Sequence, residues 1–335
     1  MAGFFALMFL NKIEYMDKNP VFDDPTPEKK FREHYKQNIL PYVEQFEEER
    51  IGALSQYRVR CFITFAIMLA AFIGACLAPV MEETRIKLIF FLVVVFGGLM
   101  AWASAPLKTY QSSVKEIIFP KIFSYFGPNF SYSPTSFISV ESLKDSQIIP
   151  SYQKESTEDY VKGSYADINI ELMEAKLTME EGSGKSRRTV TVFKGAFIFF
   201  DMKKKFLGKT IMKRDRGKMG NWFNSVDHLK KVGLVDPKFE KEFEVYSNDQ
   251  VEARYILSPT FMENIVKLND IYGGAIQCSF YANRMLIMLS SMVNRFEVGS
   301  PFEPATFEKE IKDILSQMQA IFQMIDILKL YSRNA

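Results

Sequence analysis

The chain is poor in the residue types that most often build redox and metal centres, with three cysteines and two histidines among 335 residues. Cys61 and Cys76 lie inside one apolar run and Cys278 stands alone, so a disulfide framework is excluded and a reducing compartment is expected. His34 and His228 have no CxxC or HExxH spacing around them, and a His/Cys metal site therefore lacks ligands. A site made only of carboxylates stays open, and no cofactor is expected.

Net charge of either sign is nearly absent, since the whole chain sums to +2. This balance excludes a nucleic-acid-binding polycation and an acidic tail, and we expect no nucleic acid partner because no recognised module is present. The charge is unevenly distributed, however. Residues 182–218 hold twelve Lys or Arg and two Asp, a charge of +10, which leaves −8 for the remainder.

Catalytic motifs are missing as well. "EGSGKS" (181–186) resembles a phosphate loop, but the Walker pattern needs glycine where Met179 stands, and "RRTVTVF", a strand pattern, follows the lysine instead of a helix. A Gly/Ser hairpin loop is the better interpretation. GxSxG is absent and neither histidine belongs to a motif. We therefore assign no catalytic residue and no metal ligand, and whether the protein is an enzyme stays undecided.

Two long hydrophobic runs are present in the first third of the chain. "CFITFAIMLAAFIGACLAPV" (61–80) and "IKLIFFLVVVFGGLMAWASA" (86–105) each have about twenty residues, the length that a helix needs to cross roughly 30 Å of hydrocarbon. Backbone groups in lipid must be satisfied within the segment, so both runs are predicted to be helices. The alternative is a pair of buried core helices in a soluble protein.

The connection "MEETR" (81–85) predicts a tight turn, so the two helices form an antiparallel hairpin and both ends of the chain share one side. Basic residues flank the outer ends of the runs, namely Arg50, Arg58, Arg60, Lys108, Lys115 and Lys121. The turn offers Arg85 and Lys87 beside two glutamates. The positive-inside rule then predicts a multi-pass protein of the cell inner membrane with both termini in the cytoplasm.

Three further segments are predicted to be helical. From Pro27 to Arg60, apolar residues at three- and four-residue spacing indicate an amphipathic helix that Pro41 kinks. "LKTYQSSVKEIIFPKIFSYF" continues the second run until Gly127-Pro128. The N-terminal "AGFFALMFL" is too short to span a bilayer and lacks the basic residues of a secretory signal, so we expect an uncleaved interfacial or packed segment.

The C-terminal segment has a heptad pattern. Its seam consists of Phe307, Ile311, Ile314, Met318, Ile321, Ile325 and Leu328. Such a seam packs either on the same chain, which we favour, or on a second copy in a homo-oligomeric coiled coil, for which three heptads are the lower limit.

The region between these helices has strand patterns. "RTVTVFKGAFIFFDM", "GKTIMKRD", "AIQCSF" and "RMLIML" are predicted strands, the last two forming a hairpin. "ADINIELMEAKLTMEE" shifts phase, which predicts a β-bulge near Leu172 and Met173. "KEFEVYS" and "VEARYIL" are predicted strands around a turn at Asn248-Asp249. Glu252 and Arg254 then share one strand face. They either form an exposed ion pair, or Arg254 binds a ligand.

Ser258-Pro259 predicts the start of a helix, which Gly273-Gly274 ends. Short connections favour an antiparallel sheet, so the class is α+β, a two-helix transmembrane hairpin with a mostly antiparallel cytoplasmic β domain and flanking helices. The expected domains are a cytoplasmic amphipathic region (1–60), the hairpin (61–105), a juxtamembrane helical connector (106–150), the α+β domain (151–300) and the heptad helix (301–335).

Four blocks carry a family likeness: "EDYVKG" (158–163), "FKGAFIFFDMKKKFLGKTI" (193–211), "FEKEFEVYSNDQVEARYILSPTFMENI" (239–265) and "CSFYANRMLIML" (278–289). Together with the preceding apolar hairpin they resemble the bacterial domain of unknown function 3137 family, whose members are sometimes mislabelled galanin. The resemblance implies a bacterial membrane protein with a cytoplasmic domain and no established activity, and it supplies no catalytic residue.

Two classes of function follow. In the first, the cytoplasmic domain is a binding or scaffold domain that contacts anionic phospholipid headgroups or a membrane protein partner, with Arg187, Arg188, Lys203, Lys204 and Lys205 as the electrostatic contacts and Phe206 at the interface. The same basic residues are alternatively a solvated hairpin. In the second class, the protein is a membrane-anchored enzyme with a polar cleft in the cytoplasmic domain.

Overall fold

The computed structural model describes residues 25–77, 82–202, 205–214, 228–234, 236–271, 276–290 and 296–332. The chain divides into two compact units. Unit 1 comprises Met1–Ile122 with Val298–Ile311, and unit 2 comprises Phe123–Glu297 with Lys312–Ala335. The N-terminal apolar segment, the loop at 78–81 and Gly273-Gly274 lie outside the described residues.

Unit 1 is helical, with α2 (Pro25–Asn38), α3 (Leu40–Leu77) and α4 (Glu82–Phe123). The break between α2 and α3 falls at Ile39, directly before Leu40-Pro41. Proline has no backbone donor and its ring crowds the preceding turn, so the predicted kink at Pro41 is confirmed. Phe31, Tyr35 and Phe46 on the apolar face of this segment are buried, as the spacing predicts.

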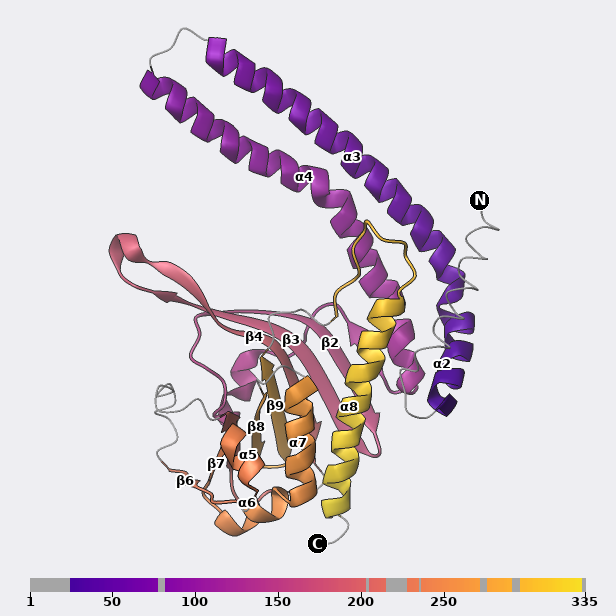
Figure 1. The fold of residues 1–335 in the computed structure, drawn as a ribbon, viewed down its shortest axis with the longest axis vertical. Coiled ribbons are helices and arrows are strands. Elements are labelled where there is room, and N and C mark those ends of the chain that lie inside the picture. The colour runs from indigo at the N-terminus through magenta and orange to yellow at the C-terminus, as the bar shows by residue number, and fades with distance from the viewer. Residues whose placement is uncertain are drawn as a thin grey trace. The chain divides into compact units, whose positions relative to one another are not determined.

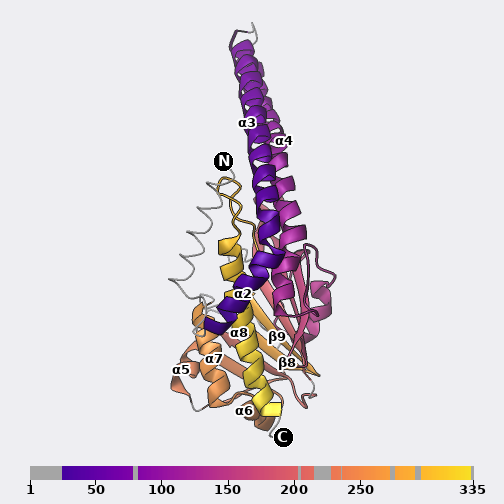
Figure 2. The same ribbon diagram turned by 90° about the vertical axis from the view of Figure 1, so that its right-hand side faces the viewer.

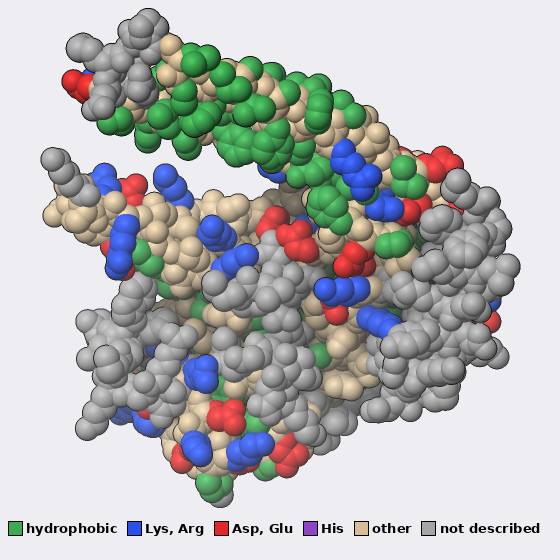
Figure 3. Space-filling model, turned by 45° about the horizontal axis from the view of Figure 1, so that its top comes forward, with side chains coloured by type: hydrophobic (Ala, Val, Ile, Leu, Met, Phe, Trp, Pro, Cys, Tyr) green, Lys and Arg blue, Asp and Glu red, His purple; other side chains and the backbone are tan. Residues whose placement is uncertain are grey.

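Helices α3 and α4 lie side by side and run antiparallel (Figures 1 and 2). The ring centroids of Phe65 and Phe96 are 6.0 Å apart. Both helices are long and apolar enough to cross a membrane, and only 11% and 6% of their most apolar windows are buried. Apolar side chains cover this surface (Figure 3), with Phe62 76% and Phe90 71% exposed. Because core helices are mostly buried, this exposure argues against the soluble-core alternative.

The 298–311 segment of unit 1 is fixed by one ion pair. Arg50 bonds Glu47 at 2.5 Å and donates to the carbonyl oxygen of Pro301 at 3.0 Å, while the backbone nitrogen of Ala305 donates to Glu47 at 2.9 Å. Phe307 packs edge-on to Phe46. Arg50 is therefore buried and its charge is neutralised, although it was counted above among the basic residues that flank the apolar runs.

In the described residues, unit 2 is built on a nine-stranded sheet whose strand pairs are all antiparallel, so the α+β class is confirmed. The strands are β1 (Ser131–Ser133), β2 (Lys154–Tyr165), β3 (Ile168–Glu181), β4 (Arg188–Asp201), β5 (Thr210–Arg214), β6 (Lys230–Lys231), β7 (Phe243–Ser247), β8 (Ile276–Tyr281) and β9 (Arg284–Ser290). Their order in space is β1-β2-β3-β4-β9-β8-β5-β7-β6.

Both faces of the sheet are covered. Helices α7 (Pro259–Ile271) and α8 (Glu308–Ser332) lie over one face (Figures 1 and 2), where Leu172 and Ile198 are buried. On the other face, Leu143 of the 3-10 helix η2 (Val140–Ser146) joins a buried cluster with Met173 and Phe197. Hence central strands carry apolar residues on both sides. Residues 106–150 form, in chain order, the end of α4, the 3-10 helix η1 (Ser124–Phe126), β1 and η2.

The phase shift of β3 has a different origin from the predicted slip within that strand. β3 keeps an unbroken register with β4 from Asn169 to Leu177. The bulge lies opposite Met173, but the extra residue belongs to β2, where the register shifts between Glu158 and Val161. The apolar residues of β3 change phase because the buried side of the strand changes from the α7/α8 face to the η2 face.

The predicted strand "VEARYIL" is wrong. β7 is preceded by α5 (Pro237–Glu242) and followed by α6 (Gln250–Ile256), which contains all of these residues except Leu257, its C-cap. The Asp249 carboxylate accepts from the backbone nitrogens of Val251 and Glu252 at 3.0 and 2.9 Å and so caps a helix, where we had expected a turn between strands. The expected strand-face pair is therefore absent: Glu252 accepts from the backbone nitrogens of residues 207 and 208 instead.

Other local predictions are confirmed. β8 and β9 form a hairpin, the Ser258 hydroxyl accepts from the Phe261 nitrogen at the start of α7, and β3 and β4 are joined by the Gly/Ser loop. That loop contains the short 3-10 helix η3 (Gly184–Ser186), and Gly182 adopts a φ of 88°, which favours glycine. No helix follows Lys185, so a Walker-type loop is excluded.

The described part of the heptad seam is buried within the single chain, and the Leu328 side chain lies outside it. Ile311, Ile314, Met318 and Ile321 are each 1% exposed and Ile325 is fully buried. The seam therefore packs intramolecularly, as the favoured alternative predicts. On a neighbouring face of α8, Phe322 stacks on Tyr165 with ring centroids 4.2 Å apart.

Candidate functional site

An open pocket of about 280 Å³ lies on the η2 face of unit 2. Its lining combines an apolar floor and wall with a polar rim. The lining residues are Ile138, Ser142, Leu143, Asn169, Glu171, Phe199, Asp201 and Arg284. The pocket is slightly smaller than the usual range for ligand sites, about 300–1,000 Å³, so it suits a small ligand.

The pocket follows from the register of three neighbouring strands. Asn169, Asp201 and Arg284 are directly paired across β3, β4 and β9 and form its polar row. Glu171 and Phe199 form the next row inward. Because alternate residues of a strand share one face, all five side chains lie on the η2 face, where the buried cluster gives way to polar groups.

The pocket is lined by more acidic than basic side chains. The Arg284 guanidinium lies 3.2 Å from the Asp201 carboxylate, and both side chains are partly exposed. Glu171 is half-buried, and its Oε2 accepts a hydrogen bond of 2.5 Å from the Tyr160 hydroxyl. Burial and this hydrogen bond raise the pKa of Tyr160, which keeps it a neutral donor. One carboxylate, Glu171, thus has no ion pair among the described residues.

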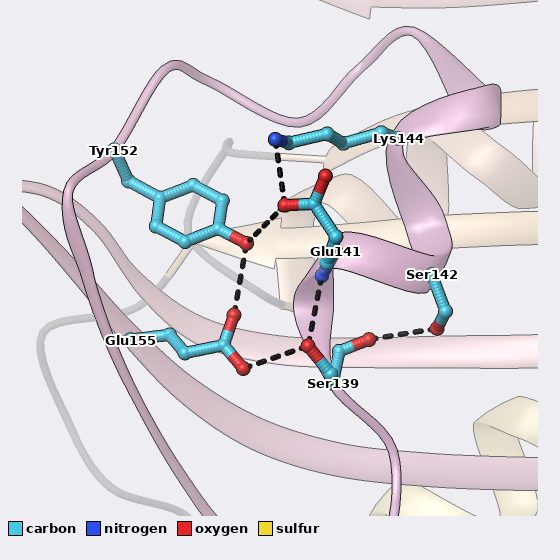
Figure 4. A network of polar contacts seen from close by, with 6 residues as sticks. All are labelled: Ser139, Glu141, Ser142, Lys144, Tyr152 and Glu155. Atoms are coloured by element: carbon cyan, nitrogen blue, oxygen red, sulfur yellow. Dashed lines mark hydrogen bonds and ion pairs between the residues drawn. The ribbon is translucent and has the colours of Figure 1, made fainter.

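A polar network holds the pocket wall against the sheet (Figure 4). The Ser139 hydroxyl accepts from the Glu141 nitrogen at 3.2 Å and donates to the Glu155 carboxylate of β2 at 2.9 Å. The Tyr152 hydroxyl donates to Glu155 at 2.8 Å, and Lys144 pairs with Glu141 at 2.6 Å. Each contact is largely exposed and individually weak, but together they cap η2 and join its segment to β2.

A second polar group lies at the bulge of β2. Glu158, Asp159 and Glu174 place one carboxylate oxygen each within 4.8 Å of one another, and Asp159 is fully buried with a φ of 51°. Tyr132 donates its hydroxyl to Asp159. Three carboxylates are the oxygen donors that a hard cation prefers, but such acidic groups are common without a metal, and this group alone does not establish a site.

Residues 191–330 match a family model described as a protein of unknown function, DUF3137. The match covers 140 of the 335 residues, and we call this stretch the DUF3137 segment. Three of the four blocks that carried the resemblance lie inside the match, and 158–163 lies outside it. The DUF3137 segment runs from β4 to α8, so it supplies Phe199, Asp201 and Arg284 to the pocket, while Glu171 precedes it.

The comparison of the chain with curated proteins gave no match. Among solved structures, the crystal structure of the mycobacterial trehalose monomycolate transport factor A, TtfA, is similar with a TM-score of 0.30 and 12% identity. The alignment covers 57% of this chain and 86% of that chain. At this TM-score the similarity supports no inference about the fold or role of the DUF3137 segment.

Among the predicted basic contacts that the structure describes, Arg187 and Arg188 lie apart from Lys205. Arg187 and Arg188 lie before and at the start of β4, where they pair with Glu180 and Glu181 at 3.3 and 3.2 Å. Lys205 follows the other end of this 14-residue strand, about 40 Å away at ~3.3 Å per residue. Lys203 and Lys204 lie outside the described residues.

Other cations of the basic window are also engaged. Lys213 on β5 is 9% exposed, and burial lowers its pKa to about 8 against the opposing charge of Glu244. Lys209 donates to the carbonyl oxygen of Asp145 at 2.7 Å. The +10 window is therefore a property of the sequence, and the described part of it forms no single basic surface.

The expectation for Phe206 is wrong. Its side chain is 8% exposed and packs on Phe280, with ring centroids 5.5 Å apart. The neighbouring Leu207 is 87% exposed instead. Glu252 fixes this loop because its carboxylate accepts from the backbone nitrogens of Leu207 and Gly208 at 2.9 and 2.8 Å.

The pocket was not predicted from the sequence. The alternation of Asn169 and Glu171 with apolar neighbours shows that both lie on one face of β3, and that signal was present. Arg284 is 83 positions from Asp201 in the chain. Nothing in the local pattern pairs β4 with β9, so the convergence of these residues was not predictable.

Proposed function

We propose that this protein is a membrane-anchored binding protein in which α3 and α4 cross the bilayer and unit 2 is the water-soluble binding domain. The observation that carries the proposal is the exposure of the hairpin, where the most apolar windows of the two helices are 11% and 6% buried. Contiguous apolar surface of this length is unfavourable in water and suits hydrocarbon.

One contact supports a membrane boundary at the base of the hairpin. The Arg60 guanidinium lies 4.8 Å from the ring of Trp102 and donates to its carbonyl oxygen at 3.0 Å. Tryptophan is enriched at membrane–water interfaces, and an arginine near a helix end extends its charged group to the same region. From Cys61 to Leu77 the helix then rises about 25 Å at ~1.5 Å per residue, close to the thickness of the hydrocarbon core.

The proposed topology places both ends of the chain in the cytoplasm of a bacterial cell, because Arg58, Arg60 and Lys108 flank the base of the hairpin. A fluorescent protein fused after Ala335 should be fluorescent, whereas alkaline phosphatase fused there should be inactive, since it matures only outside the cytoplasm. Phosphatase fused after Glu83, near the opposite end of the spans, is the matched control and should be active. The reverse pattern would contradict the topology.

We further propose that unit 2 contacts anionic headgroups through Lys203, Lys204 and Lys205. Lys205 is exposed and adjoins the exposed Leu207, so cationic and apolar groups occur together, as at membrane surfaces. Arg187 and Arg188 are the weaker candidates because Glu180 and Glu181 offset their charge. A membrane protein partner with an acidic surface would use the same contacts.

Hydrogen exchange of the full chain in lipid nanodiscs tests this contact. Backbone amides of 205–209 should exchange several-fold more slowly with anionic than with zwitterionic lipid, because approach to the headgroups excludes water. The triple change of Lys203, Lys204 and Lys205 to Gln should abolish that difference, whereas the matched pair Arg187→Gln and Arg188→Gln should leave it intact. Equal exchange in both lipids would remove the headgroup contact.

The pocket favours binding over catalysis. Its lining residues include no His, Cys or Lys, and the Ser142 hydroxyl donates to the carbonyl oxygen of Ser139 at 2.7 Å. A serine nucleophile needs an adjacent base that removes its proton, and the carbonyl oxygen to which Ser142 donates is not such a base. A membrane-anchored enzyme is therefore the second proposal, after the binding protein.

A further inference from the structure

We propose that the pocket on the η2 face of unit 2 binds a small organic cation, with the Glu171 carboxylate as the counter-charge and Phe199 as the apolar floor. The class of ligand is an ammonium group attached to a compact apolar body. This inference is independent of the membrane-anchored function proposed above, because every residue that carries it lies in unit 2.

The charge of the ligand follows from the balance of the lining. Two carboxylates, Glu171 and Asp201, face a single guanidinium, that of Arg284. Arg284 is paired with Asp201 at 3.2 Å. Lys162 stands opposite Glu171 in the β2–β3 register, but it is exposed and forms no ion pair with Glu171 among the described residues, so the carboxylate without an ion pair is Glu171. A half-buried carboxylate without a cationic partner attracts a cation more strongly than an exposed one, because its surroundings screen the interaction less.

The position of the cation follows from the Tyr160 hydrogen bond. The Tyr160 hydroxyl donates to Oε2 of Glu171, which fixes the carboxylate and leaves Oε1 as the acceptor for a ligand. A neutral phenol supplies no positive charge, so Glu171 keeps its full attraction for an ammonium group. Charge-assisted hydrogen bonds of this kind are roughly twice as strong as neutral ones.

The apolar part of the ligand follows from the remaining lining. Phe199 is 7% and Leu143 1% exposed, and both belong to the cluster that fills the η2 face, with Ile138 packed against it. The floor is thus part of the buried core of this face. A ligand body on this floor removes apolar surface from water while its charged end reaches Glu171, which an inorganic cation would not do.

Ligand-observed fluorine NMR on the full chain in detergent micelles tests the proposal with three probes that share one ring. The probes are 4-fluorobenzylammonium, 4-fluorobenzyl alcohol and 4-fluorobenzoate. We expect the ammonium probe to bind and the benzoate to bind least. Glu171→Gln should weaken binding of the ammonium probe by about tenfold or more, because one charge-assisted hydrogen bond is lost. Exposed Glu263→Gln on α7 makes the same charge change and should have no effect.

A second variant keeps the test decisive if Glu171→Gln perturbs folding. Arg284→Gln removes the cation beside Asp201, so Asp201 becomes a second carboxylate without an ion pair. The affinity for the ammonium probe should therefore rise severalfold. A loss of folding cannot produce this gain. Equal binding to wild type and Glu171→Gln, preference for 4-fluorobenzoate, or unchanged or weaker binding to Arg284→Gln would each overturn the proposal.

Discussion

Arginine in place of both Leu69 and Val93 is expected to release the chain from the membrane pellet after an alkaline wash. Each side chain is 62% exposed and lies near the middle of its apolar run, 61–80 or 86–105. An arginine at the centre of a spanning helix costs about 2.5–3.5 kcal/mol. Two such changes shift the insertion equilibrium by at least ~1,000-fold, because every 1.4 kcal/mol is a factor of ten.

The control for this experiment uses equally exposed apolar residues of unit 2. Val251 and Phe137 are 79% and 80% exposed, and arginine there should leave the pellet unchanged. In water, substitution of an exposed side chain changes stability by no more than about 0.5 kcal/mol. If the hairpin faces water, the two double variants will behave alike. That result would remove the membrane anchor.

Lysine in place of both Ile314 and Ile321 is expected to unfold the protein. Both side chains are 1% exposed on α8, so each lysine would place a charge where no water reaches it. Buried charges of this kind belong to the class of substitutions that cost about 4 kcal/mol or more, and two of them consume most of a typical stability of about 5–15 kcal/mol. Loss of the cooperative melting transition is the measurement.

Exposed positions on the same helix provide the matched control. Ser316→Lys and Gln323→Lys make the same change of charge on the outer side of α8 and should leave the melting temperature nearly unchanged. Size-exclusion chromatography with light scattering distinguishes the alternative. A folded chain that merely dissociates to a smaller species on Ile314→Lys and Ile321→Lys would place the seam between two copies.

Local patterns predicted most of the individual elements. The apolar runs, the β8–β9 hairpin, the capped start of α7 and the heptads of α8 each follow from residues that are close in the chain, where capping and periodicity act directly. "VEARYIL" was predicted wrongly because a short run of β-branched and apolar residues suits either state. Asp249 decided it, since its carboxylate satisfies two free backbone donors of a helix start.

The long segment of β2 was not predicted because its polar residues alternate with few apolar ones. "KESTEDYVKGSY" buries mainly its second half, and Asp159 at the bulge is buried in spite of its charge. Pairing with β1 and β3 stabilises this strand. Such pairing lies outside any local pattern.

The sequence by itself determined that two segments are apolar enough to cross a bilayer, because length and hydropathy are additive along one helix and need no partner. It also determined the seam of α8 through its period. Only the tertiary structure decided which polar groups converge. Asp201 meets Arg284 because β4 pairs with β9, and Glu171 is held by Tyr160 because a bulge in β2 aligns them. Register between distant strands is set by the packing of the whole sheet, and that information is not local.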